Sequence, residues 1–241
     1  MIRYNGIILT TFIKFNGKFL NGIFKMRITR FSVLVQVGDK NAVCFLPNPG
    51  RLEELLVFDA QVILREAKKG DRKTLYDLVG VYRGDQIVSV DSRLPNRLVF
   101  ESLKNRDLPE FAGYVKIKPE YLYGHTRFDF LLSGNDVPCL LEVKSCTLVR
   151  DGVAMFPDAP TKRGTRHVLE LVKAKNEGYR ACILFIIQRT DAYAFKPNDE
   201  TDAAFGKALR YAAECGVEAY AYSSEFKVDR MALKGRVKVI L

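Results

Sequence analysis

Between Arg127 and Cys146 the sequence has two apolar runs that read as β-strands, RFDFLL and CLLEVKSC. The segment that joins them, SGNDVP, contains Gly134, Asn135 and Asp136, which are residue types that favour tight turns. Two runs of strand length on either side of such a turn predict a β-hairpin. The chain is therefore expected to build a sheet around this hairpin.

The predicted hairpin carries charge where a strand is usually apolar. Asp129 lies in the first strand, and Glu142 and Lys144 lie in the second. Glu142 and Lys144 share one face because side chains alternate along a strand. If Leu132 pairs with Cys139, the same register places Asp129 opposite Glu142, and like charges so placed destabilise a sheet. A divalent metal ion between the two carboxylates would remove this conflict.

The order of these groups is that of the PD-(D/E)xK nuclease core, in which an acid on one strand precedes D/E-x-K on the next. Mg²⁺ and Mn²⁺ prefer oxygen ligands, which the carboxylates of Asp129 and Glu142 and the carbonyl of Val143 would supply. Lys144 would orient a water molecule or screen a phosphate. Phe128 departs from this pattern, which usually has Pro before the first acid. A buried Asp–Lys or Glu–Lys ion pair fits the same spacing and stays open as an alternative.

Charge is distributed unevenly along the chain. The formal net charge is +10, and residues 1–83 hold 14 Lys and Arg against 7 Asp and Glu. A basic first third favours a polyanionic partner, and DNA is the partner expected. A surface tuned for solubility would give the same excess of charge.

Other features of the composition exclude several classes. No apolar run approaches the about 20 residues of a membrane span, and the start of the chain lacks a convincing signal peptide, so we expect a cytoplasmic protein without a membrane partner. The five cysteines form no C-x-x-C pair, which indicates buried thiols in a reducing compartment and no zinc site. The sequence leaves the oligomeric state open, a dimer included.

The first third of the chain predicts an OB-like β-barrel. Five short strands are expected, with one short helix at Leu52–Leu56 after the third, which is the element order of that fold. The expected strands are 23–30, 31–37, 42–46, 60–66 and 74–83.

The pattern then changes to strands alternating with helices, which argues for an α/β domain. The whole chain is therefore expected to be mixed α/β, with an OB-like domain at 1–83 and a nuclease-like α/β domain at 84–241. The expected helices are one that follows Asp91 and Ser92 and runs to about Lys104, one at 161–177 with Thr161 as N-cap, and one at 200–214. Expected strands are 113–118, the hairpin at 126–146, 152–156, 180–188 and 217–222.

Several basic residues are candidate DNA ligands because they lie on strands with aromatic neighbours or beside helix starts. These candidates are Lys25, Arg27, Arg30, Arg51, Arg93, Arg97, Arg163 and Arg166. Phe24 and Phe31 are interleaved with the first three and fit either a binding face or the core. His167 fits either a role near the metal or simple packing.

The chain also resembles the sugar fermentation stimulation protein (SfsA) family. The matching segments are FLPNPGRLEELL (45–56), DSRLPNRLV (91–99), RFDFLL (127–132), LEVKSCTLV (141–149), AMFPDAPTKRGTRHVLEL (154–171) and AAECGVEAYAY (212–222). Residues 1–15 look like an extension beyond the usual start. The resemblance implies an N-terminal OB-like domain, a PD-(D/E)xK-type domain, DNA binding with little sequence preference and a regulatory role in sugar (maltose) metabolism.

Three functional hypotheses follow. The first is a DNA-binding regulator that retains a nuclease-like metal site. The second is an active Mg²⁺- or Mn²⁺-dependent nuclease that uses Asp129, Glu142 and Lys144. The third is a regulator that binds a small molecule or a protein, in which the charged cluster is only structural.

Overall fold

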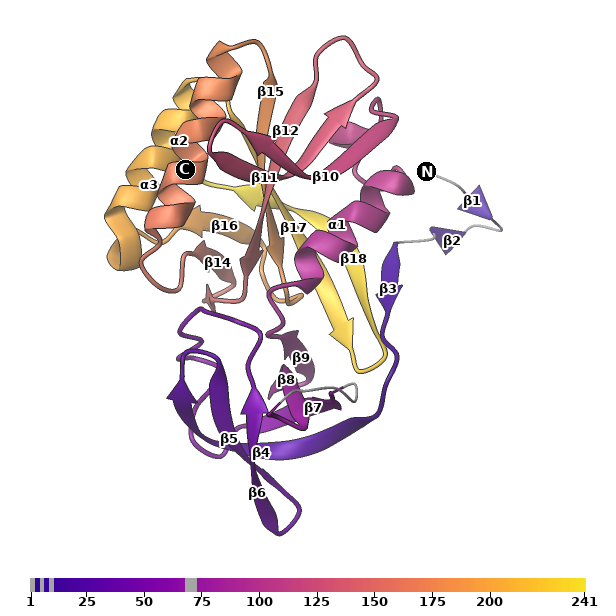
Figure 1. The fold of residues 1–241 in the computed structure, drawn as a ribbon, viewed down its shortest axis with the longest axis vertical. Coiled ribbons are helices and arrows are strands. Elements are labelled where there is room, and N and C mark those ends of the chain that lie inside the picture. The colour runs from indigo at the N-terminus through magenta and orange to yellow at the C-terminus, as the bar shows by residue number, and fades with distance from the viewer. Residues whose placement is uncertain (1–2, 5–6, 9–10, 68–72) are drawn as a thin grey trace.

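Alternating apolar residues in the first third of the chain build a β-barrel, and the rest of the chain builds an α/β domain above it in Figure 1. The structure is a computed structural model that describes residues 3–4, 7–8, 11–67 and 73–241. Ahead of the barrel, β1 (Arg3–Tyr4) pairs with β2 (Ile7–Ile8). The third strand, β3 (Phe12–Lys14), pairs with a strand of the α/β domain.

The barrel strands pair in the order β6-β5-β4-β7-β8-β9, and a parallel contact of Phe45 with Asp77 joins β6 to β8 and closes the barrel. Val33 and Val35 illustrate its core, because both are fully buried while their strand neighbours are less so. The strands are β4 (Phe19–Thr29), β5 (Ser32–Val37), β6 (Lys40–Phe45), β7 (Gln61–Glu66), β8 (Tyr76–Arg83) and β9 (Gln86–Ser89).

The α/β domain is built on a mixed sheet in the order β10-β11-β12-β15-β17-β18-β16-β14-β13. Its strands are β10 (Lys116–Tyr123), β11 (Thr126–Ser133), β12 (Cys139–Cys146), β13 (Val149–Arg150), β14 (Val153–Phe156), β15 (Arg180–Ile187), β16 (Ala194–Pro197), β17 (Glu218–Lys227) and β18 (Arg230–Val239). Its helices are α1 (Leu94–Lys104), the 3₁₀ turn η1 (Pro109–Phe111), α2 (Lys162–Asn176) and α3 (Asp199–Glu214).

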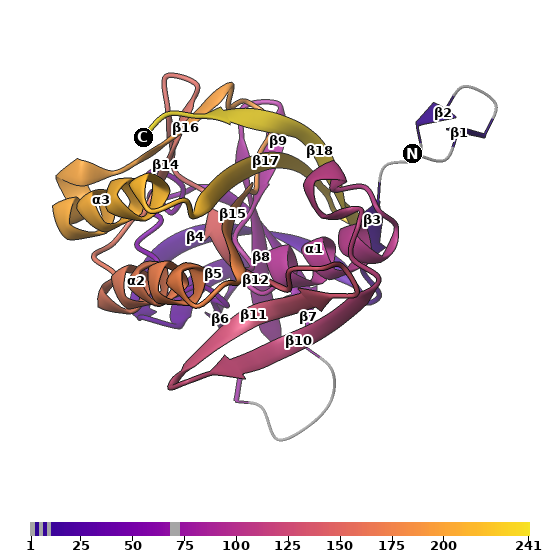
Figure 2. The ribbon, with the colours of Figure 1, turned by 90° about the horizontal axis from the view of Figure 1, so that it is seen from above.

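Helices cover both faces of the central parallel strands β12, β15 and β17 (Figure 2). In β15, Ile183 and Phe185 pack with α2 and α3, whereas Cys182 and Leu184 pack with α1. This double burial explains why the run at 180–188 is apolar throughout. In the hairpin, β12 contacts both α1 and α2, so the charged side chain of Glu142 on this strand is buried.

The barrel docks on the α/β domain through polar contacts with the loop after β6. The Leu52 N–H, in this loop, donates to the Asp158 carboxylate of the α/β domain at 3.2 Å. Asp158 lies just before α2, so the same segment that leads into this helix also holds the barrel loop. Within the ranges that the structure describes, no helix is long and apolar enough to span a membrane.

Most predicted elements are confirmed, including the hairpin and the Thr161 cap, whose hydroxyl accepts the Gly164 N–H at 3.0 Å. The helix expected at Leu52–Leu56 is wrong. The segment forms a turn that begins at Leu52 with φ of +56°, and Asp158 takes up the Leu52 N–H that would otherwise be free. The helix expected after Asp91 and Ser92 begins at Leu94 and ends at Lys104.

Other elements lie where the sequence suggested none. The strands β9, β16 and β18 and the pairing of β3 with β18 were not expected. The domain boundary expected at residue 83 falls in the turn between β8 and β9, and β9 continues the barrel sheet. Part of the expected extension at residues 1–15 lies outside the described residues, and its later part, β3, joins the α/β sheet.

Candidate metal centre

The centre begins where the pairing of β11 with β12 gives way to a side chain. The strands pair through Leu132–Cys139 and Phe130–Leu141, which confirms the predicted register. One step further, the Val143 N–H donates at 2.7 Å to the carboxylate of Asp129. The other oxygen of Asp129 accepts the side-chain amide of Asn96 from α1 at 2.5 Å. Asp129 is thus fixed between β12 and the first turn of α1.

Glu142 lies beside Asp129 and is only 3% exposed. Its Oε1 accepts from Nδ1 of His167 at 2.6 Å and from the ammonium group of Lys144. Its Oε2 is buried without a hydrogen-bond partner among the described residues. One oxygen of this carboxylate is therefore fully used, and the other is left for a group that the protein itself does not provide.

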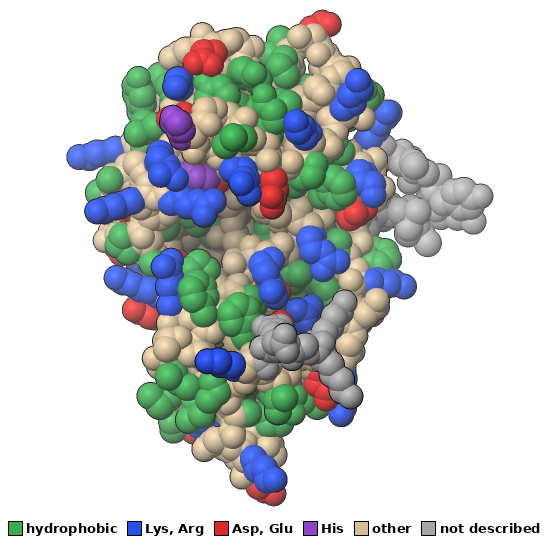
Figure 3. All heavy atoms as spheres, in the orientation of Figure 1, with side chains coloured by type: hydrophobic (Ala, Val, Ile, Leu, Met, Phe, Trp, Pro, Cys, Tyr) green, Lys and Arg blue, Asp and Glu red, His purple; other side chains and the backbone are tan. Residues whose placement is uncertain are grey.

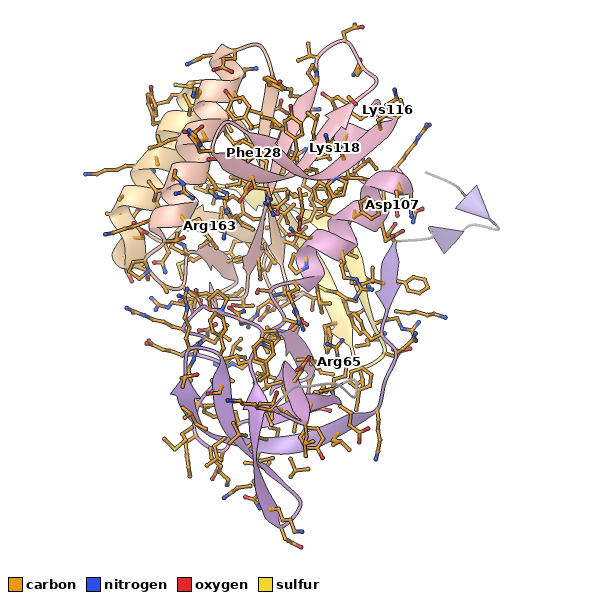
Figure 4. All side chains as sticks on the ribbon, in the orientation of Figure 1. Arg65, Asp107, Lys116, Lys118, Phe128 and Arg163 are labelled. Carbon is orange, nitrogen blue, oxygen red and sulfur yellow. The ribbon has the colours of Figure 1, made fainter. Side chains whose placement is uncertain are left out.

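The hydrogen-bond order assigns the tautomer of His167. Arg163, in the first turn of α2, donates its Nε–H to Nε2 of His167 at 3.3 Å. A guanidinium group only donates, so Nε2 accepts and the ring proton is on Nδ1, from where it is donated to Glu142. Phe128 packs edge-on against the imidazole ring. Figure 4 labels Phe128 on β11 and Arg163 near the start of α2.

The two carboxylates have different electrostatic surroundings. Burial, together with the nearby charge of Glu142, raises the pKa of Asp129 to about 7. Burial also acts to raise the pKa of Glu142, but the charge of Lys144 and the hydrogen bond from His167 outweigh it and lower that pKa. Close to neutral pH, Glu142 is ionised and Asp129 is partly protonated, which reduces the repulsion between the two carboxylates.

The donors present fit a hard divalent cation. The candidate ligands are the carboxylate of Asp129, the orphaned Oε2 of Glu142 and the carbonyl of Val143, which points to the same side as the N–H bonded by Asp129. All are oxygens, as Mg²⁺ and Mn²⁺ require. Across the described ranges, no three His, Cys, Asp or Glu side chains are arranged to hold a metal, so water or phosphate oxygens would complete the shell.

The predicted basic residues of the barrel divide into two groups. Arg27 is structural, because its guanidinium donates to the carbonyls of Gly50 and Arg51 at 2.6 and 2.8 Å and binds further carbonyls nearby. Lys25 forms an ion pair with Asp59 at 2.7 Å. Arg30 and Arg51 are exposed.

The basic residues of the α/β domain lie nearer to the carboxylates. Arg93 is bonded to Asp91 at 2.6 Å, but its side chain is half exposed. Arg97 in α1 and Arg163 and Arg166 in α2 are exposed. In Figure 3 blue side chains are spread over this face of the molecule, on the α/β domain and on the barrel below it, with few red ones between them.

Asn96 is the residue of the centre that the sequence interpretation missed. It follows Leu94 and Pro95 at the start of α1 and is separated from Asp129 by about thirty residues of sequence, so no local pattern connects the two. His167 was considered from the sequence for a role near the metal, and the structure brings it into contact with Glu142.

Two family models together cover most of the chain. The model described as "SfsA N-terminal OB domain" matches residues 26–90, and the one described as "Sugar fermentation stimulation protein RE domain" matches residues 93–230. The chain belongs to the sugar fermentation stimulation protein (SfsA) family. The resemblance stated from the sequence is thereby confirmed, together with the OB-type barrel and the mixed α/β class.

Relatives match over nearly their whole length. The sugar fermentation stimulation protein homolog of Caldanaerobacter subterraneus subsp. tengcongensis is 43% identical over 92% of this chain and 97% of its own. The homolog of Thermoanaerobacter sp. is 45% identical over 91% and 96%. A solved structure of Pyrococcus furiosus SfsA in complex with Ca²⁺ is 30% identical, covers 95% of this chain and 100% of its own, and superposes with a TM-score of 0.87.

Proposed function

We propose that this SfsA protein binds DNA with little sequence preference and cleaves phosphodiester bonds with Mg²⁺ or Mn²⁺ held at Asp129 and Glu142. The observation that carries the proposal is the buried Oε2 of Glu142, which lies beside a second carboxylate and has no hydrogen-bond partner in the part of the chain that the structure describes. A buried carboxylate oxygen without a partner costs about 1–3 kcal/mol, and a bound cation would recover that energy. The Ca²⁺ complex of the Pyrococcus furiosus relative supports a hard cation in this fold.

Each residue of the centre has a task in this chemistry. Asn96 and the Val143 N–H orient Asp129, and His167 fixes the rotamer of Glu142 so that Oε2 points away from the imidazole. Lys144 donates to Glu142 and would orient the attacking water or screen the phosphate. When bound, the metal would lower the pKa of a water ligand and stabilise charge on the phosphate.

The DNA part of the proposal is supported by charge. Arg97, Arg163 and Arg166 are exposed on the helices that flank the two carboxylates, and the chain has a net charge of +10. Affinity that arises from such contacts depends on the release of counterions, so it should fall steeply as salt is raised.

Metal binding is tested by thermal shift. Mg²⁺ or Mn²⁺ should raise the melting temperature of the wild type, because a ligand that binds only the folded state stabilises it. Glu142→Gln should abolish that shift, whereas Asp136→Asn, at the exposed turn of the same hairpin, should retain it. An equal shift in all three proteins would contradict the site.

Cleavage is tested on plasmid, linear duplex, single-stranded and branched DNA. The wild type should cut at least one of these with Mn²⁺ or Mg²⁺, and Asp129→Ala should not. Equal cleavage by both proteins would indicate a contaminating nuclease and would refute the catalytic role of Asp129.

A second candidate is a DNA-binding regulator of sugar (maltose) metabolism that retains the centre without turnover. One observation favours it, namely that the ammonium group of Lys144 is already hydrogen-bonded to Glu142. Salt-dependent DNA binding that survives Asp129→Ala, with no cleavage under any condition, would support this candidate.

A further inference from the structure

The barrel exposes a phenylalanine in a place where the core does not need it. Phe31 lies in the turn between β4 and β5 and is 44% exposed. Phe24, the other phenylalanine interleaved with the basic residues of this segment, is only 4% exposed and lies in the core. The guanidinium of Arg30 lies 5.5 Å from the centre of the Phe31 ring. Phe31 also stacks on Phe45, with ring centroids 6.4 Å apart and planes inclined by 26°. The result is a partly exposed ring that has a cation over it.

This pair of rings leads toward the metal centre. Arg93 lies 5.9 Å from the Phe45 ring on the side of α1. Three residues further along, Asn96 donates to Asp129. The aromatic pair is therefore joined to the carboxylates through the first turn of a single helix.

A second exposed ring repeats the arrangement on the same barrel. Phe58, in the loop between β6 and β7, is 72% exposed, and the ammonium group of Lys25 lies 5.4 Å from its ring centre. Phe58, Lys25 and Arg51 line a hollow of about 470 Å³. Arg27 connects the two places, because it bonds the carbonyls of both Arg30 and Arg51.

We infer that the barrel binds single-stranded nucleic acid, with unpaired bases stacked on Phe31 and Phe58 and the backbone beside Arg30, Lys25 and Arg93. The inference rests on the proposed function and names its substrate class, a nucleic acid with an unpaired segment. Flat rings stack on the faces of bases, and cations beside them attract phosphates. The faces of bases within a duplex are covered by their neighbours, so a duplex would not use these rings.

The main competitor is a protein partner, because Met26, Ile28 and Val43 are also exposed on the barrel strands. The cations decide between the two. Each exposed phenylalanine has a basic group over its ring, and a protein interface that buried these rings would also have to remove those charges from water. A polyanion instead receives them as counterions, Arg30 directly and Lys25 in exchange for Asp59, its ion-pair partner at 2.7 Å.

The test is fluorescence anisotropy in EDTA, which prevents cleavage. The probes are an oligothymidylate strand, a strand of equal length made of abasic sites, and a duplex of equal length. The wild type should bind oligothymidylate at least about fivefold more tightly than the abasic strand, because each stacked base contributes about 1–3 kcal/mol. Phe31→Ala and Phe58→Ala should each weaken oligothymidylate binding by about fivefold or more and should change duplex binding by less than about twofold.

Two further variants control the result. Phe31→Leu keeps an apolar side chain against Phe45 but lacks a flat ring, so it should lose affinity as Phe31→Ala does. Tyr211→Ala removes an exposed ring from the distant α3 and should change nothing.

Equal affinity for the thymidylate and abasic strands, or equal losses on strand and duplex, would overturn the inference and leave the proposed function standing. Failure to bind any of the three probes would overturn both. Self-association that Phe58→Ala abolishes, with no effect on the strands, would assign the surface to a protein and would also overturn the inference.

Discussion

Within the metal centre, the imidazole of His167 has a structural task that can be measured separately from catalysis. It is 2% exposed and donates to Glu142 at 2.6 Å. We expect His167→Ala to lower the free energy of unfolding by about 2 kcal/mol, because buried hydrogen bonds to charged groups are worth about 1.5–3 kcal/mol. Urea unfolding in EDTA measures this. Arg163 contacts the same ring from an exposed position. Its replacement in Arg163→Ala should therefore change the free energy of unfolding by less than about 0.5 kcal/mol. Equal losses in the two variants would contradict this role.

The sequence predicted some of the residue contacts of the metal centre. Alternation along two strands and the turn between them were sufficient to bring Asp129, Glu142 and Lys144 together. The sequence did not reveal that Asp129 replaces a β11 carbonyl as the acceptor for Val143, or that Asn96 holds it from the other side. Both contacts depend on how α1 packs across the sheet, which is tertiary information that no local pattern encodes.

Among the elements, α2 has the clearest local signal and the most direct connection to the centre. Its cap is Thr161, whose hydroxyl accepts the Gly164 N–H at 3.0 Å. We expect Thr161→Ala to cost about 1 kcal/mol of unfolding free energy, the usual value of a lost N-cap, and Thr161→Ser to cost less than about half of that. Chemical denaturation of the three proteins compares them. If serine were as damaging as alanine, the methyl group rather than the hydroxyl would be the stabilising group.

Helices and strands were predicted correctly where the hydrophobic period agreed with the capping and turn residues at their ends. The prediction failed where pairing between distant segments determines the structure. In β18, alternation is interrupted by Gly235 and flanking cations, and the strand is held by pairing with β17, β16 and β3. The Leu52–Leu56 run has helical spacing, yet Asp158 captures its first N–H and Arg27 binds the carbonyls before it. Tertiary hydrogen bonds here override local propensity.

For the whole molecule, the junction of barrel and α/β domain is the feature that the sequence could least anticipate. Asp158 accepts the Leu52 N–H at this junction, and a Cβ added to Gly50 would force its carboxylate to move. Glu54, also partly buried, lies close enough for its charge to interact with that of Asp158. Two acids from different domains thus share one poorly solvated place, and for Asp158 backbone N–H groups and, to a smaller extent, the charge of Arg27 oppose the effect of burial.

This arrangement predicts a pH dependence of stability. Burial raises the pKa of Asp158 above the ordinary value of 3.8, although backbone N–H groups and the charge of Arg27 oppose the shift. Burial likewise raises the pKa of Glu54. Between the ordinary and the raised pKa, the folded protein keeps protons that the unfolded chain has released, so stability falls as pH rises through that window.

Asp158→Asn removes one of these titrations and keeps an oxygen for the Leu52 N–H. We expect its unfolding free energy to fall less than that of the wild type as pH rises from about 4, the ordinary carboxyl pKa, through the raised value. Asp136→Asn, exposed in the hairpin turn, should follow the wild-type curve. Urea unfolding across this window, in EDTA so that the metal centre stays empty, compares the three proteins. If the unfolding free energy of the wild type changed with pH at the same slope as that of Asp158→Asn, the prediction would be wrong. The Asp158 carboxyl would then be as well solvated in the folded protein as in the unfolded chain.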